Sequence, residues 1–219
     1  GLELVSMQSW LFGVTGAALF EGPEERQRFK VGISRAIDLA GRFDIPNLVF
    51  GSPRQRCVPD GMPMDSALTE AAELFGMLGD RAAAARTKIA IEANPAIYGT
   101  NFLNTLEDAI SFVDLVDHPA VVAILDLGAM HINGDFAAVP RMIPNIASRL
   151  NHVHVSEPHL APAPASANAL TPVLKALRGH GYKGAVSIEM KRPDGGLAEV
   201  EAAIARLAGA AQSLGVCHA

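Results

Sequence analysis

The stretch Ala120-Val121-Val122-Ala123-Ile124-Leu125-Asp126 decides the fold class of this chain. Six apolar residues follow one another, and a carboxylate comes directly after them. A near-continuous apolar run of this length is typical of a strand buried on both faces, as in a parallel sheet covered by helices. The stretch therefore predicts an α/β protein in which Asp126 marks the carboxyl end of a strand.

Short apolar runs of the same kind alternate with helical patterns along the whole chain. A helix is expected to open at Pro23, where apolar residues recur at helical spacing as far as Ala40. We predict strands at 4–10, 47–50, 88–93, 120–126, 151–156 and 184–190, and further helices at 65–86, 105–116, 136–149, 167–178 and 197–214. Six strand-then-helix units result, which we interpret as one domain spanning residues 1–219.

Ionisable residues at the predicted strand ends favour a closed barrel over an open, doubly wound sheet. No strand is followed by GxGxxG or GxxxxGK[ST], which argues against an open nucleotide-binding sheet. By contrast, Glu92, Asp126, His154 and Glu189 stand at the carboxyl ends of four successive strands. A (β/α) barrel of the TIM type gathers such residues on its top face, where active sites lie.

Two Glu, one Asp and one His converging on a point would suit a divalent ion. Oxygen-rich ligation with a single imidazole favours the harder ions among Mn, Mg, Co and Zn. A single strand-end carboxylate is more often a loop cap or a salt-bridge partner, so the metal hypothesis depends on the four residues together.

The chain resembles the xylose-isomerase-like TIM barrels, a superfamily of sugar isomerases, ketose 3-epimerases and endonuclease IV, and is most similar to bacterial sugar phosphate isomerase/epimerase proteins. The similarity runs across essentially the whole chain. It is carried by Val49-Phe50-Gly51-Ser52-Pro53, Ile91-Glu92-Ala93-Asn94-Pro95, Tyr98-Gly99-Thr100-Asn101-Phe102, Leu125-Asp126, His152-Val153-His154-Val155-Ser156-Glu157-Pro158 and Ser187-Ile188-Glu189-Met190-Lys191.

The resemblance implies the ligands and the reaction. Glu92, Asp126, His154 and Glu189 match the family's metal ligands, and Glu92 and Glu189 match the acid/base pair of its epimerases. The implied activity is isomerisation or epimerisation of a small sugar, polyol or sugar phosphate. A proton leaves the carbon next to a carbonyl, and the metal stabilises the resulting enediolate.

Two positions depart from the epimerase pattern. A His usually lies three positions after the strand-end Asp, where this chain has Ala129, and His131 lies two further on. His131 either substitutes for that residue or is a surface histidine. An Arg usually lies six positions after the metal-binding His, where this chain has Leu160 preceded by His159. We count His131 and His159 among the candidate substrate-binding residues.

Four further residues complete the candidate substrate contacts, and three of them have an alternative role. Trp10 either forms an apolar wall for a sugar or packs in the core or at an interface. Arg54, together with Arg56, either holds a substrate phosphate or is an exposed loop arginine. Asn94 follows Glu92 in the family motif. Glu157 either orients a ligand from behind or is a solvated loop acid.

His152 also admits two interpretations. It is either a core residue that also supports a ligand from behind or a ligand itself, and the first is favoured because the position that matches the metal ligand is His154.

Composition narrows the class of protein. Forty-nine per cent of the residues are hydrophobic and 19% are charged, and 18 basic residues against 23 acidic ones give a net charge of −5. Such a chain can bury a sizeable core, and it lacks the basic footprint of a general nucleic-acid binder. The two cysteines, Cys57 and Cys217, suggest neither a disulfide framework nor a zinc motif. Without a signal peptide or an apolar run long enough for a membrane span, we expect a cytoplasmic protein.

Six strands are fewer than the eight of a complete TIM barrel. Aligned by resemblance they correspond to strands three to eight, so we expect the first two βα units to be missing. Six such units cannot close without exposing strand edges. We therefore expect a truncated chain, an altered barrel or a barrel completed by a partner, and the exposed edges favour a homo-oligomer.

Two other functions remain open. A catalytically impaired metal-binding or assembly protein on the same scaffold would account for the missing units, for Ala129 and for Leu160. An endonuclease-IV-like phosphodiesterase is less favoured, because that chemistry needs a histidine-rich site and a basic surface.

Overall fold

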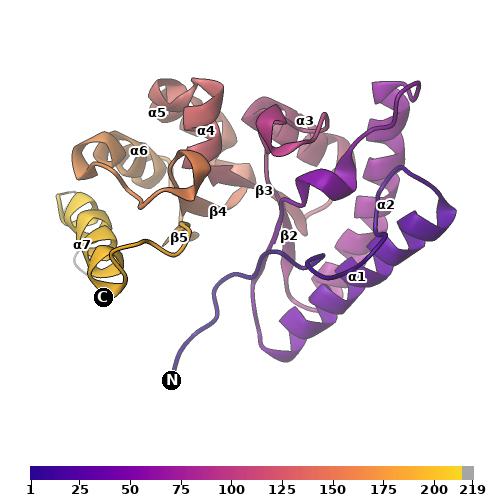
Figure 1. Cartoon of the computed structure of the whole chain (residues 1–219), viewed down its shortest axis with the longest axis horizontal. Helices are drawn as coiled ribbons and strands as arrows, with labels where there is room; N and C mark the ends of the chain where they lie inside the picture. The colour runs from indigo at the N-terminus through magenta and orange to yellow at the C-terminus, as the bar shows by residue number, and fades with distance from the viewer. Residues whose placement is uncertain (214–219) are drawn as a thin grey trace. The chain divides into compact units, whose positions relative to one another are not determined.

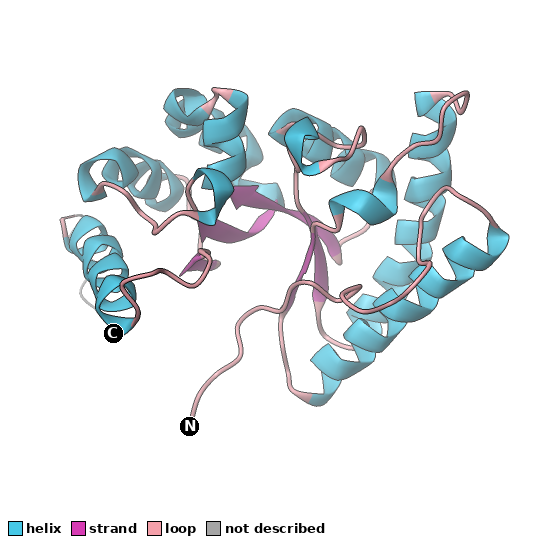
Figure 2. Ribbon diagram, viewed as in Figure 1, coloured by secondary structure: helices cyan, strands magenta, loops and turns pink. Residues whose placement is uncertain are grey.

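The computed structural model describes residues 1–213 and divides into two compact units (Figure 1). The first unit comprises Gly1–Ile124, and the second unit begins at Leu125. Strands and helices alternate in both (Figure 2). The first unit contains α1 (Pro23–Arg42), β1 (Asn47–Phe50), η1 (Pro53–Arg56), α2 (Met64–Ala84), β2 (Lys88–Ile91), η2 (Ala96–Tyr98), α3 (Leu106–Val116) and most of β3 (Val121–Asp126). The second unit adds α4 (Leu127–Asn133), η3 (Phe136–Ala138), α5 (Val139–Ile146), η4 (Ala147–Arg149), β4 (Leu150–Val155), η5 (Pro158–Leu160), α6 (Ala167–Gly179), β5 (Ala185–Ile188) and α7 (Leu197–Gln212).

The strands of the first unit pair in parallel and in chain order. Val49 of β1 lies opposite Ala90 of β2, which lies opposite Val122 of β3. These side chains and Ile124 form one buried row on one face of the sheet. Because side chains alternate along a strand, Phe50 and Ile91 face the other way. Glu92, which follows β2, continues the register of Ala90.

An aromatic cluster fills the face of this sheet that the helices cover. Phe50 contacts the rings of Phe29 from α1 and Phe75 from α2, with centroids 5.7 and 5.0 Å apart. Phe75 in turn meets Phe112 of α3 edge to face. Helix α3 begins with a capping box, in which the Thr105 hydroxyl accepts from the main-chain N–H of Asp108 and the Asp108 carboxylate accepts from that of Thr105.

In the second unit β4 and β5 also pair in parallel, with His154 opposite Ser187. His152 and His154 share one face of β4, and Val153 and Val155 lie buried on the other. Strands that pair in parallel and alternate with helices confirm the α/β fold class.

The strand predicted at 4–10 is wrong. Only Met7 pairs with β1: its N–H donates to the carbonyl of Asn47, and its carbonyl accepts from the N–H of Val49. Leu4 and Val5 are exposed, and Ser9 has a positive φ of 60°. The segment therefore has no buried face that would extend the pairing, and residues 1–213 contain five strands instead of six.

The helical predictions need two corrections. The helix predicted at 136–149 is three short pieces, η3, α5 and η4. Helix α5 has Pro140 in its first turn and Pro144 inside it, and neither proline has an N–H to donate to a helical hydrogen bond. Helix α4 was not predicted at all. The last predicted helix is confirmed from 197 to 212, whereas its predicted end at Leu214 lies outside the described residues, as does Cys217. Among the described helices, none is both long and apolar enough to cross a membrane.

Removal of the ring at the centre of the aromatic cluster should cost much of the first unit's stability. Phe50 is 1% exposed, so Phe50→Ala is expected to lower the free energy of unfolding by about 3–5 kcal/mol. Phe12, which is 93% exposed, provides the matched control, and Phe12→Ala should change it by less than about 0.5 kcal/mol. Urea unfolding followed by circular dichroism measures both values. Equal effects of the two substitutions would contradict the packing described.

Candidate metal centre

Three of the predicted ligands converge at strand ends within the second unit. Asp126 is the last residue of β3, His154 lies in β4, and Glu189 directly follows β5. The Nδ1 atom of His154 lies 3.0 Å from Oε2 of Glu189 and 3.7 Å from Oδ2 of Asp126. The His154 side chain is 4% exposed, and those of Asp126 and Glu189 are 11% and 22% exposed. Two carboxylates thus share one buried imidazole.

The donor set of these three residues fits a divalent cation. One ligand atom from each lies within 4.8 Å of the others, near the upper limit of about 4.6 Å for two atoms that ligate a common ion at about 2.3 Å. One imidazole, even when protonated, cannot balance two carboxylates. A bound cation would offset the remaining negative charge, whose burial is otherwise costly.

Asp126 is held rigidly by its neighbours. Its Oδ1 accepts from the N–H of Ala129 at 2.6 Å and thereby caps α4, and its Oδ2 accepts from the Ser156 hydroxyl at 2.8 Å. The Ser156 oxygen also accepts from the N–H of Gly128 at 2.7 Å. A Cβ at Gly128 would lie only 2.9 Å from that oxygen, so the close approach requires glycine. These contacts direct the carboxylate before any ion binds.

His152 lies beneath His154 on the same face of β4. Its Nε2 lies 2.7 Å from the Ser187 hydroxyl, and its ring meets that of His154 edge to face. Burial, helped by the nearby His154, lowers the pKa of His152 to about 4, although Glu189 opposes the shift. The ring is therefore neutral at neutral pH, and its place agrees with the core and support interpretation.

Glu92 is oriented by contacts within the first unit. Its Oε2 accepts from Nδ2 of Asn94 at 3.0 Å, and its main-chain carbonyl accepts from Nη1 of Arg56 at 2.9 Å. A Cβ at Gly51 would overlap the Glu92 carboxylate. Asn94 is 7% exposed, so its observed role is to direct Glu92, and contact between Asn94 and substrate stays a prediction.

The two arginines after β1 differ. Arg54 is exposed, so phosphate binding by Arg54 stays a prediction. Arg56 is fully buried, and it donates to the main-chain carbonyls of Glu92 and Leu103. Both interpretations of Arg56, phosphate ligand and exposed loop arginine, are therefore wrong.

Trp10 packs against the aromatic cluster. Its ring centroid lies 5.9 Å from that of Phe50, and its Nε1 donates to the carbonyl of Met7 at 3.3 Å. This is the packing interpretation of Trp10, and a sugar contact stays a prediction.

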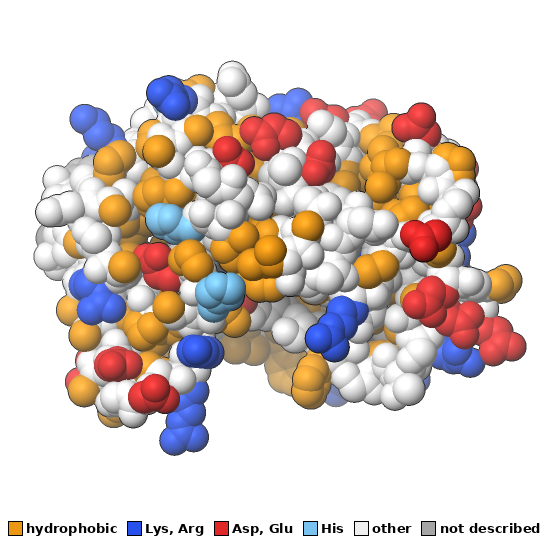
Figure 3. Space-filling model, turned by 45° about the horizontal axis from the view of Figure 1, so that its top comes forward, with side chains coloured by type: hydrophobic (Ala, Val, Ile, Leu, Met, Phe, Trp, Pro, Cys, Tyr) orange, Lys and Arg blue, Asp and Glu red, His pale blue; other side chains and the backbone are white. Residues whose placement is uncertain are grey.

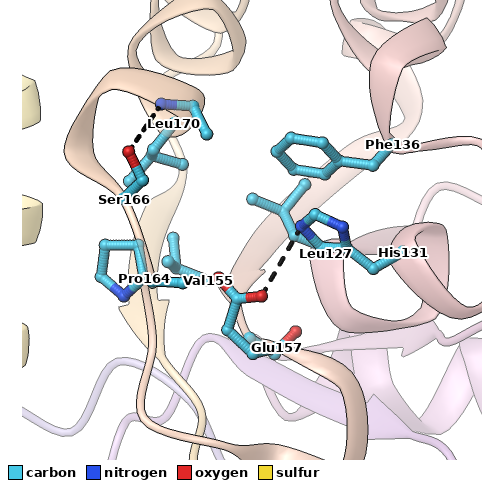
Figure 4. Close-up of a pocket in the computed structure, with 11 residues that line it drawn as sticks. Leu127, His131, Phe136, Val155, Glu157, Pro164, Ser166 and Leu170 are labelled. Carbon is cyan, nitrogen blue, oxygen red and sulfur yellow. Dashed lines mark hydrogen bonds and ion pairs between the residues drawn. The ribbon is translucent and has the colours of Figure 1, made fainter.

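His131 and Glu157 line a small pocket of about 90 Å³ in the second unit (Figure 4). The His131 ring stacks on Phe136, with centroids 3.8 Å apart, and its Nε2 lies 3.8 Å from Oε2 of Glu157. The other carboxylate oxygen of Glu157 accepts from the N–H of Ala165 at 2.8 Å. The described contacts of Glu157 are thus with Ala165 and His131. They anchor the loop before α6 and do not reach Asp126, His154 or Glu189.

His159 and Leu160 lie exposed on η5, both with positive φ values of 59° and 57°. Substrate binding by His131, Glu157 and His159 stays a prediction. Neither helix α4 nor the role of Ser156 in holding Asp126 was predicted from the sequence. An Asp directly after a strand and a glycine at 134 are the capping signals that could have located α4.

Loss of the Ser156 hydroxyl should loosen Asp126. Ser156→Ala leaves Oδ2 of Asp126 and the N–H of Gly128 without this partner, so we expect a loss of about 1–3 kcal/mol in the free energy of unfolding. Ser66 is exposed on α2, and Ser66→Ala should change it by less than about 0.5 kcal/mol. The comparison is made by urea unfolding, and indistinguishable values would refute the supporting role of Ser156.

Comparisons with known proteins agree with this fold. A family model described as "Xylose isomerase-like TIM barrel" matches residues 1–214, whereas no curated protein matches the chain. The solved structure of 3-keto-D-glucoside 4-epimerase YcjR from E. coli aligns with a TM-score of 0.76 and 20% identity, covering 97% of this chain and 80% of that one. D-psicose 3-epimerase from Clostridium cellulolyticum H10, crystallised with D-tagatose, aligns with a TM-score of 0.70 and 20% identity over 89% of this chain and 66% of that one.

A third structure in this group holds a metal. The IolI protein with a bound zinc atom aligns with a TM-score of 0.68 and 16% identity, covering 95% of this chain and 75% of that one. Of the three structures, the psicose epimerase is the longest relative to this chain, which spans just under two thirds of its length. At these identities the structural likeness shows the fold. Since the family model covers nearly the whole sequence, the chain belongs to the xylose isomerase-like TIM barrel family.

Proposed function

We propose that this protein is a divalent-metal-dependent isomerase or epimerase of a small sugar, polyol or sugar phosphate. The observation that carries the proposal is the convergence of Asp126, His154 and Glu189 at the carboxyl ends of strands. Carbohydrate substrates are supported by the sugar epimerases among the structural neighbours.

From the family resemblance we further propose that Glu92 is the fourth metal ligand. Its orientation by Asn94 and the space left by Gly51 support a role for this carboxylate beyond packing. When bound, the ion would polarise the substrate carbonyl and stabilise the negative charge that develops beside it. Mn, Mg, Co and Zn all suit the donor set, and Mn is our first choice because three of the four ligands are carboxylates.

Glu92 and Glu189 are proposed as the proton-transfer pair. One carboxylate would remove the proton next to the carbonyl, and the other would return a proton from the opposite side. Transfer by both inverts that carbon, whereas return to the adjacent carbon isomerises the sugar. Trp10, Arg54, Asn94, His131, Glu157 and His159 remain the proposed substrate contacts, and we propose a cytoplasmic homo-oligomer.

The second candidate is a metal-binding protein without turnover. It is favoured by Ala129, which stands where the epimerase pattern has His. The described contact of Ala129 with the site is a hydrogen bond from its main-chain N–H to the Asp126 carboxylate. An endonuclease-like phosphodiesterase is less favoured, because the net charge is −5 and the Lys and Arg side chains on the face in Figure 3 lie among acidic ones.

The metal content tests the ligands directly. Elemental mass spectrometry of the purified protein should find about one equivalent of a divalent ion, which Asp126→Ala and His154→Ala should both lose. Asp60→Ala and His180→Ala replace exposed residues of the same types and should retain it. No ion in the parent protein, even after incubation with excess Mn²⁺, would refute the proposal.

Proton exchange separates an enzyme from a binding protein. In D₂O with Mn²⁺, the parent protein should exchange the proton next to the carbonyl of at least one of D-fructose, D-tagatose, D-psicose or L-ribulose, as proton NMR would show. Glu92→Gln and Glu189→Gln should slow the exchange about 100-fold or more, whereas Glu73→Gln, on the exposed face of α2, should not. Bound metal without exchange on any of these sugars would favour the second candidate.

A further inference from the structure

Arg56 carries a buried charge to which the proposed reaction assigns no direct role. Its side chain is the largest among those of the described residues that are fully buried. Burial lowers its pKa to about 10, while the nearby Glu92 and Cys57 oppose the shift, so the guanidinium stays charged at neutral pH. Burial of a charge is costly, and an apolar side chain of similar size would fill the same space at a lower cost.

The guanidinium bridges two main-chain carbonyls. Nη1 donates to the carbonyl of Glu92 at 2.9 Å, and Nη2 donates to that of Leu103 at 3.4 Å. Its Cζ lies 5.6 Å from the centroid of the Phe50 ring. Glu92 is the first residue after β2, and Leu103 lies near the end of the following loop, so the planar fork of Arg56 joins the two ends of this loop.

The residues after Arg56 hold the middle of the same loop. The Cys57 thiol donates to the carbonyl of Gly99 at 2.9 Å. Val58 and the side-chain amide of Asn101 exchange two hydrogen bonds of 2.8 and 2.9 Å. Three consecutive residues after β1 therefore fix the loop after β2, and Arg56 acts where Glu92 leaves the strand.

We propose that Arg56 is a positioning residue that fixes the main chain of Glu92, so that the carboxylate, already directed by Asn94, keeps one orientation. The inference rests on the proposed function of Glu92 as a ligand and proton-transfer group. Neither an apolar residue nor a lysine presents two coplanar donors to both carbonyls.

The test compares Arg56→Met, which removes the charge, with Arg56→Lys, which retains it, and uses Arg35→Met on the exposed face of α1 as the control. Mn²⁺ binding to each protein is measured by calorimetry at a temperature at which circular dichroism shows the variant to be folded. Both Arg56 variants should raise the dissociation constant about tenfold or more, and the control should leave it unchanged. If the Met variant does not fold, the Lys variant alone decides.

The outcomes separate Arg56 from the proposed function. Unchanged Mn²⁺ affinity in the folded Arg56 variants would overturn the positioning role while leaving the metal site intact. If Arg56→Lys binds Mn²⁺ as tightly as the parent protein and Arg56→Met does not, the positive charge matters and the two hydrogen bonds to the carbonyls do not, which would overturn the bridging role. If the parent protein binds no Mn²⁺, the proposed function fails, and amide hydrogen exchange of residues 92–104 then decides: faster exchange in Arg56→Lys upholds the hold of Arg56 on this loop, and equal exchange overturns it.

Discussion

The crowding of two carboxylates around one buried imidazole is the constraint on which the second unit depends. Glu189 and Asp126 both approach Nδ1 of His154, from the ends of two other strands. Protonation of the imidazole would balance only one of the two negative charges. A bound cation would offset the remaining charge, and the parallel strands hold the three groups where one ion could meet them.

The neighbouring residues serve this arrangement. Ser156, Gly128 and the N–H of Ala129 hold the Asp126 carboxylate, and the same contacts begin helix α4. The hydrogen bonds that orient the Asp126 carboxylate are thus the same ones that cap helix α4. In the first unit, the loop after β1 similarly fixes the loop after β2 through Arg56.

Much of this could be predicted from the sequence, because buried parallel strands and their terminal residues leave a strong local pattern. The run that ends at Asp126 predicted its strand, and alternation placed His152 and His154 on one face. What could not be predicted depends on contacts distant in sequence. Arg56 can be buried because it donates to two main-chain carbonyls that lie 36 and 47 positions away in the sequence. The segment at 4–10 has the apolar pattern of a strand, but no element among the described residues packs over it.

A crystal grown with Mn²⁺ and measured for its anomalous signal tests the central claim most directly. We expect one strong peak about 2.0–2.3 Å from ligand atoms of Asp126, His154 and Glu189. The position of Glu92 relative to that peak would show whether it is the fourth ligand. A Mn²⁺ peak elsewhere, or none beside these three side chains at saturating Mn²⁺, would contradict the assignment of this cluster as a metal centre.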